Sequence, residues 1–154
     1  MTTRKQYDER AQALVDYFTA HGWPAAGREI ERDTKGKVSK LFVSRHSNGK
    51  GKEEVTPLGA GLYAPADRAR FDPMPMSRDV AAALLAIPPG DVIDDRDHLR
   101  LFKIAVIMGR KGFATVKISR TTRAGIRRQT ARVTLTEQGR AMVEAKARLA
   151  KDEF

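Results

Sequence analysis

The stretch that decides the fold runs from residue 109 to 139 and reads GRKGFATVKISR (109–120), TTRAGI (121–126) and RRQTARVTLTEQG (127–139). Apolar and polar side chains alternate over 114–119 and again over 131–135. A period of two in segments rich in β-branched residues indicates half-buried strands. The polar, glycine-containing residues 121–125 between them suit a hairpin loop. The sequence therefore predicts a β-hairpin with one face packed on a core.

The net charge of the chain is concentrated in this hairpin and the segment before it. Between Asp97 and Glu137 every charged residue is basic, with histidine counted as neutral, and there are ten of them. The formal net charge of the whole chain is also +10, so the remaining charges cancel. An exposed sheet edge can carry charge merely for solubility, but a solubilising face usually mixes both signs. We therefore expect a surface that binds a polyanion.

The candidate residues of this surface are the ten cations together with two lysines from an earlier basic segment. They are Arg100, Lys103, Arg110, Lys111, Lys117, Arg120, Arg123, Arg127, Arg128 and Arg132, with Lys50 and Lys52. We expect Lys117, Arg128 and Arg132 on the outward face of the hairpin. Arg120, Arg123 and Arg127 should crowd its tip.

Bulk composition narrows the class of protein. With 154 residues, 41% of them hydrophobic and 31% charged, the chain fits one ordinary globular domain or two very small ones. The absence of cysteine excludes thiol catalysis, disulfides and cysteine-ligated zinc, and suits the cytoplasm. No apolar run is long enough to cross a bilayer, and the first residues lack the apolar core of a signal peptide. We expect a cytoplasmic protein without a membrane partner.

Helical spacing of apolar residues predicts helices over 6–21, 24–32, 77–87, 98–108 and 140–151. The helix over 98–108 is the most apolar, so it should be largely buried and expose a basic stripe with Arg100, Lys103 and Arg110. The segment 35–45 is ambiguous, because Val38, Leu41 and Phe42 also have helical spacing. The glycine-containing turn cluster at 47–51 and the extended run at 53–56 favour a strand there.

The two halves of the chain share a short pattern of residues. Lys-Gly, Ser-Arg, Val-Thr and Gly occur at 35–36, 44–45, 55–56 and 61, and again at 111–112, 119–120, 133–134 and 139. This match predicts a diverged internal repeat. The prolines between 65 and 75 suggest a linker. We therefore predict an α+β fold of two tandem helix-plus-β-hairpin units, residues 1–64 and 77–154, joined by residues 65–76.

Few residues suggest catalysis or metal binding. The acidic cluster of Asp91, Asp94, Asp95 and Asp97 beside His98 could hold a divalent metal, but Asp95 or Asp97 would more simply cap the next helix. The three histidines lack zinc-ligand spacing, and the lysines near residue 50 lack the P-loop pattern. No nucleophile elbow is present. We expect no cofactor, no metal site and no enzymatic activity.

The segment VTLTEQGR (133–140) resembles the post-wing segment of MarR-like and PadR-like bacterial regulators, in which Leu-Thr leaves the wing and a glycine starts the last helix. The resemblance covers residues 77–154, and residues 6–64 only through the internal match. It implies winged helix-turn-helix units and a transcriptional regulator that contacts double-stranded DNA. A second copy on a palindromic site is one arrangement. In such families the helix before the wing has a polar, basic face, whereas the helix over 98–108 offers only a narrow stripe.

Three alternatives remain at the level of sequence. They are an RNA- or ribosome-binding module, a protein-binding inhibitor on a winged-helix scaffold, and a metal-dependent nuclease. Single-stranded RNA is gripped by aromatic stacking, for which only Phe42 and Phe113 are available. The preferred hypothesis is a DNA-binding, nucleoid-associated regulator with a basic wing.

Overall fold

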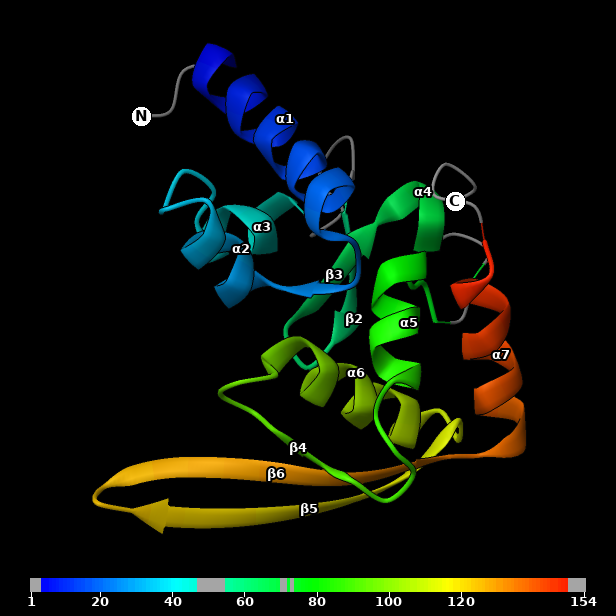
Figure 1. Cartoon of the computed structure of the whole chain (residues 1–154). Helices are drawn as coiled ribbons and strands as arrows, with labels where there is room; N and C mark the ends of the chain where they lie inside the picture. Colours follow the sequence, from blue (N-terminus) through cyan, green and yellow to red (C-terminus); the bar gives the residue numbers. More distant parts are fainter. Residues whose placement is uncertain (1–3, 47–54, 70–71, 73, 150–154) are drawn as a thin grey trace. The chain divides into compact units, whose positions relative to one another are not determined.

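Two three-stranded antiparallel sheets with accompanying helices make up the computed structural model, which describes residues 4–46, 55–69, 72 and 74–149 (Figure 1). This confirms the predicted α+β class. The chain divides into two compact units, Met1–Pro75 and Met76–Phe154. The division falls inside the predicted linker, although part of that segment is ordered as the end of strand β3 and a short helix, α4.

The first unit, which we call unit 1, surrounds a three-stranded sheet with helices. Its elements are α1 (Arg4–His21), β1 (Ala25–Ala26), α2 (Gly27–Asp33), α3 (Lys40–His46), β2 (Val55–Gly59), β3 (Leu62–Pro65) and α4 (Ala66–Ala69). Strand β3 lies between β1 and β2. Leu14, Phe18, Ile30, Val38 and Val43 are among the buried side chains that form its core.

The second unit, unit 2, has a similar order of elements and a longer hairpin. Its elements are α5 (Arg78–Leu85), β4 (Val92–Asp94), α6 (Leu99–Arg110), β5 (Ala114–Arg123), β6 (Ile126–Leu135) and α7 (Glu137–Ala147). Helix α6 packs on β5 and β6, and α5 packs on α7. Ile93, Ile104, Met108, Ala131 and Val143 are fully or almost fully buried.

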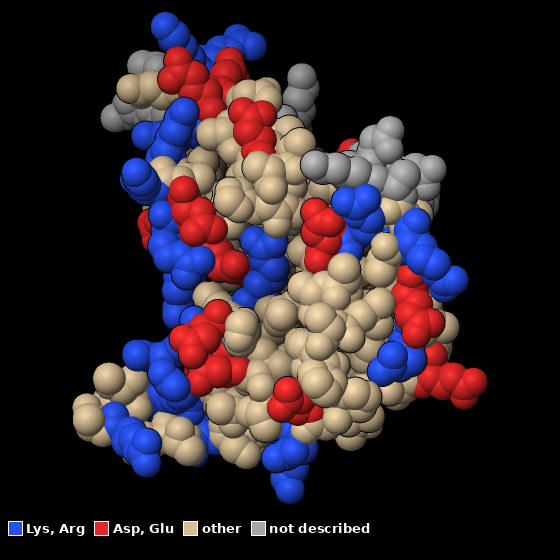
Figure 2. All heavy atoms as spheres, viewed as in Figure 1, with Lys and Arg blue, Asp and Glu red and all other residues tan. Residues whose placement is uncertain are grey.

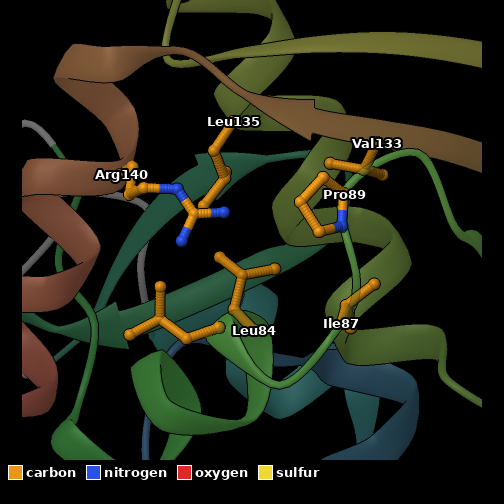
Figure 3. Close-up of a pocket in the computed structure, with 7 residues that line it drawn as sticks. Leu84, Ile87, Pro89, Val133, Leu135 and Arg140 are labelled. Atoms are coloured by element: carbon orange, nitrogen blue, oxygen red, sulfur yellow. The ribbon is translucent and has the colours of Figure 1, made fainter.

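A small hollow lies among α5, the loop after it, β6 and α7 (Figure 3). Its lining consists of Leu84, Leu85, Ile87, Pro89, Val133, Leu135 and Arg140. Six of these seven side chains are apolar. Ligand sites place several converging polar groups around an apolar cavity, whereas this hollow offers one cation. We interpret it as a packing feature of unit 2.

The two units share a topology. In each, a helix leads to a short strand, and the second strand of a later hairpin pairs with that short strand. Between the short strand and the hairpin, unit 1 has two helices, α2 and α3, and unit 2 has one, α6. The register of unit 1 aligns Ala26 with Leu62, and that of unit 2 aligns Ile93 with Ala131. Helix α3 therefore occupies the place in unit 1 that α6 occupies in unit 2.

The strand predicted over 35–45 is wrong, because residues 40–46 form α3. Ser39 begins this helix: its Oγ accepts a hydrogen bond from the Phe42 amide at 3.0 Å, as an N-cap serine does. Val38 and Val43 are buried while Leu41 is exposed, which is not the alternation of a strand. The residue-by-residue repeat is therefore also wrong, since it aligned a helix with strand β5.

The hairpin of unit 1 is formed instead by β2 and β3. The predicted turn at 47–51, which includes Lys50, and the extended residues 53 and 54 lie outside the described part of the chain, as does Lys52. The observed turn is at Ala60 and Gly61, both with positive φ angles of 54° and 77°. Such angles match the twist of paired strands in a two-residue hairpin turn.

Other element boundaries also differ from the predictions. The short strands β1 and β4 were not expected, and α2 begins at Gly27, three residues later than predicted, because β1 comes first. Helix α7 begins at Glu137 and not at Arg140, since Thr136 is its N-cap and accepts a hydrogen bond from the Gly139 amide at 3.1 Å.

The Leu-Thr-x-x-Gly pattern has a structural explanation. The backbone amide of Thr136 donates to the carbonyl of Phe113 at 3.0 Å, so the chain leaving β6 is tied to the start of β5. A Cβ atom on residue 139 would overlap the Phe113 carbonyl oxygen and lie 2.8 Å from its carbonyl carbon. Only glycine permits this approach of helix α7 to the hairpin base.

Candidate nucleic-acid interface

The hairpin of β5 and β6, which we call the wing, is longer than its sequence pattern predicted. Residues 114–123 pair continuously with residues 126–135. The residues predicted as a loop, 121–125, mostly belong to β5, and the turn itself is Ala124 and Gly125. Their φ angles of 52° and 76° suit the tight turns that connect twisted strands.

Only the base of the wing is anchored in the core. Ala114, Ala131 and Val133 are buried, whereas every residue from Lys117 to Arg128 is exposed. Five residue pairs lie beyond the pair of Ile118 and Ala131. At roughly 3.3 Å per residue, these five pairs span about 16 Å. Figure 1 shows the hairpin of β5 and β6 extending past the helices of unit 2.

Cations occupy both faces of the wing. The register places Lys117 opposite Arg132 and Arg128 opposite Thr121, on the face that points away from the core. Arg120 and Arg127 belong to the other face, which continues the buried side of the hairpin beyond the end of the core. Figure 2 shows Lys and Arg side chains along the wing. Because residues 114–135 include no acid, the wing itself is uniformly positive.

Two of the six wing cations have partners outside the wing. Arg128 Nη1 lies 3.3 Å from Asp94 Oδ2, and Arg132 Nη1 donates to the carbonyl of Gly90 at 2.7 Å. Within the described residues, the other four have no ion pair with a carboxylate. They are Lys117, Arg120, Arg123 and Arg127. A polyanion would therefore meet these four without first displacing an acidic partner.

The acidic loop beside the wing fixes the backbone and does not cap α6 as predicted. The N-cap of α6 is His98. Asp95 Oδ1 instead accepts from the Gln129 amide at 3.0 Å, and the Asp95 amide donates to the Gln129 carbonyl at 2.9 Å. The loop thereby continues the pairing of β4 with β6.

Asp94 orders the same loop from within. Its Oδ1 accepts backbone hydrogen bonds from Arg96 at 2.7 Å and from Asp97 at 3.2 Å. These hydrogen bonds, the Arg96 one foremost, and the charge of Arg128 hold the pKa of the Asp94 carboxyl below its ordinary value, against the opposing effect of burial. Among the described residues, no group of three or more His, Asp or Glu side chains could hold a metal ion.

The structure spreads the other predicted cations along α6. Arg100 and Lys103 are half-buried near its start, while Arg110 and Lys111 are exposed at its end, next to the base of the wing and away from its tip. Most of the helix is packed against the rest of unit 2, with its buried side chains at Phe102, Ile104, Ala105, Ile107 and Met108. Helix α6 thus presents little of the exposed polar surface that the resemblance to winged-helix regulators implies.

The basic residues of segment 35–45 were expected on a hairpin of unit 1, whereas the structure places two of them on helix α3. Lys40 and Arg45 are exposed on α3, and Lys35 and Lys37 are exposed in the segment before it. They were overlooked as helix residues because the segment was predicted as a strand. Ser39 was the available signal, since a serine just before residues with helical spacing often marks a helix start. The neighbouring hairpin, Val55 to Pro65, has no charged residue.

No protein-family model matches the chain, and comparisons with curated proteins and with solved structures found no significant match. No helix in the described part of the chain has the length and apolar character needed to cross a membrane.

Proposed function

We propose that this protein is a non-enzymatic DNA-binding protein, built from two winged helix-turn-helix units, that acts in transcription regulation. The element order and the pairing of the first strand with the last in each sheet support the winged-helix assignment. The single observation that supports DNA binding most strongly is the wing: a hairpin that extends beyond the core, has exposed cations on both faces and contains no acid.

Physical chemistry favours a nucleic-acid duplex as the polyanion. Arginine binds phosphate through a planar fork of donors, and five of the six wing cations are arginines. Phosphate contacts by such residues release counterions and supply most of the affinity that does not depend on sequence. A two-stranded ribbon fits the major groove, and arginine side chains at its tip could enter the minor groove.

Single-stranded RNA is less well supported. Proteins that bind single strands usually stack bases on aromatic side chains. Residues 114–135 contain no aromatic residue, and both Phe42 and Phe113 are half-buried. The wing therefore offers charge without a stacking platform.

The test is a titration of the whole chain with a DNA duplex of about 25 base pairs, with single-stranded DNA and with an RNA hairpin, over a range of salt concentrations. We expect the duplex to bind most tightly and the logarithm of its affinity to fall linearly with the logarithm of salt concentration. Tighter binding of either RNA or the single strand would favour the RNA alternative. Absence of duplex binding at low salt would refute the proposal.

A further inference from the structure

We propose that helix α3 of unit 1, and not α6 of unit 2, is the element that reads DNA bases. The wing of unit 2 then supplies affinity without sequence preference. This inference rests on the proposed function and deepens it, because it assigns sequence specificity to one unit and phosphate binding to the other. The specificity residues would be Lys40, Leu41 and Arg45.

The exposed face of α3 has the composition that base contact requires. At about 100° per residue, positions 40, 41, 44 and 45 fall on one side of a helix. Lys40 and Arg45 are exposed there and Leu41 has 58% of its surface exposed, while Val43 on the opposite side is fully buried. Among the large hydrophobic residues of the described chain, Leu41 is the most exposed.

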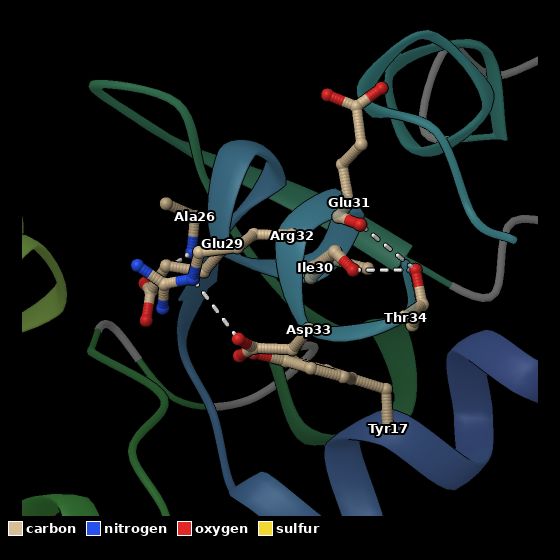
Figure 4. Close-up of polar contacts among 8 residues, drawn as sticks. All are labelled: Tyr17, Ala26, Glu29, Ile30, Glu31, Arg32, Asp33 and Thr34. Atoms are coloured by element: carbon tan, nitrogen blue, oxygen red, sulfur yellow. Dashed lines mark hydrogen bonds and ion pairs between the residues drawn. The ribbon is translucent and has the colours of Figure 1, made fainter. Parts of the chain in front are cut away.

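The acids of the neighbouring helix α2 make contacts within unit 1, and Figure 4 draws Glu29 and Asp33 with their partners. Glu29 Oε1 accepts from the Ala26 amide at 3.0 Å. Glu31 Oε1 lies 3.5 Å from the Lys40 amide, at the start of α3, where a negative charge favours the helix dipole. Both of these contacts are with backbone amides.

The third acid of α2 faces α1. Asp33 Oδ2 accepts from the hydroxyl of Tyr17 at 2.8 Å, and Asp33 Oδ1 lies 3.1 Å from Arg32 Nε. Burial raises the pKa of the Asp33 carboxyl, but these two hydrogen bonds more than offset it and hold that pKa below the ordinary value. Within the described residues, no acidic side chain forms an ion pair with Lys35, Lys37, Lys40 or Arg45.

The chemistry of this face matches the major groove. Arginine and lysine donate to the O6 and N7 acceptors of guanine, and apolar side chains contact the thymine methyl group. Helix α6 cannot supply the same set, because Arg100 and Lys103 are half-buried and its most exposed cations lie at its last turn. Hairpin β2–β3 has no charge of its own.

In the first step of the experiment, the whole chain is mixed with a pool of DNA duplexes of random sequence, and the duplexes that it binds most tightly are selected. Affinities are then measured for the selected duplex and for a scrambled duplex of equal length. Leu41→Ala changes no charge, so it should lower the ratio of the two affinities several-fold while leaving the salt dependence unchanged. Arg45→Ala should lower the ratio by about tenfold, the loss expected for one specific base contact. Val15→Ala and Arg4→Ala, at exposed positions of α1, are the matched controls and should leave the ratio unchanged.

The outcomes separate this inference from the proposed function. Absence of duplex binding by the unchanged chain would refute the proposed function itself. If the chain binds duplexes but selection yields no preferred sequence, the inference fails and the proposed function stands. The inference also fails, and the proposed function stands, if both α3 variants keep the ratio of the two affinities while Arg100→Ala with Lys103→Ala lowers that ratio. Tryptophan fluorescence of Trp23, which is buried in unit 1, verifies that each α3 variant is folded.

Discussion

The two units have the same topology but place their positive charge on different elements. In unit 1 the helix before the hairpin is short, exposed and basic, and the hairpin of eleven residues is uncharged. In unit 2 the corresponding helix is longer and mostly buried, and the hairpin is long and basic. A shared fold therefore does not imply a shared role, because the function depends on which element is exposed and charged.

The difference follows from how each helix is buried. Helix α3 has seven residues and is anchored by Val43 and the half-buried Phe42, so Lys40, Leu41 and Arg45 remain exposed. Helix α6 has twelve residues with apolar side chains around most of its axis, and a helix of that kind must be buried. The wing extends beyond this buried helix, so in unit 2 the hairpin exposes cations along its length and α6 exposes them at its end.

The largest effect on stability should come from a substitution at Gly139, where helix α7 approaches the base of the wing. We predict that Gly139→Ala destabilises unit 2 by about 3 kcal/mol or more, because the new methyl group overlaps the Phe113 carbonyl and a backbone atom cannot move aside as a side chain can. Urea unfolding followed by circular dichroism measures the change.

The matched control is Gln138→Ala, an exposed position in the same helical turn, which should shift stability by no more than about 0.5 kcal/mol. The fluorescence of Trp23 comes from unit 1 alone and shows whether that unit keeps its fold. Equal stability of the Gly139 and Gln138 variants would mean that the helix does not approach the hairpin as described.

A smaller effect should distinguish neighbouring arginines of the wing. We predict that Arg127→Ala lowers the salt slope of duplex affinity by about 0.9, the value for one phosphate contact. Arg128→Ala should lower it by less, because Arg128 is already paired with Asp94. In an Asp94→Asn background Arg128 has no charged partner. Its replacement by alanine should then lower the salt slope as much as that of Arg127 does. Equal salt slopes for the two single variants would show that the ion pair with Asp94 does not weaken the contact of Arg128 with phosphate.

Sequence patterns were sufficient where a segment had one strong periodicity. The alternation over 114–119 and 131–135 predicted the strands of the wing, and the apolar character of 98–108 predicted a buried helix. They failed where the structure depends on a few local contacts. The Ser39 cap turned an ambiguous segment into α3, and two-residue strands such as β1 have no periodicity to detect.

The candidate site was only partly predictable for a related reason. The cations of the wing follow from sequence, because they are consecutive along a hairpin. The pairing of Arg128 with Asp94 joins residues far apart in the chain and depends on β4, which no pattern indicated. Likewise, the exposure of Lys40 and Arg45 on one face could not be inferred while their segment was predicted as a strand.

The most direct test of the wing as the phosphate-binding surface is the salt slope of duplex affinity for the triple variant Arg120→Ala, Arg123→Ala and Arg127→Ala. These three cations are exposed and have no carboxylate partner among the described residues. We predict that the slope falls by about 2.7, or three contacts at about 0.9 each. The control, with Arg4, Lys5 and Arg148 replaced by alanine, removes the same charge from helix ends and should change the slope by less than about 1. A folded wing variant that keeps the slope of the unchanged chain would contradict the account.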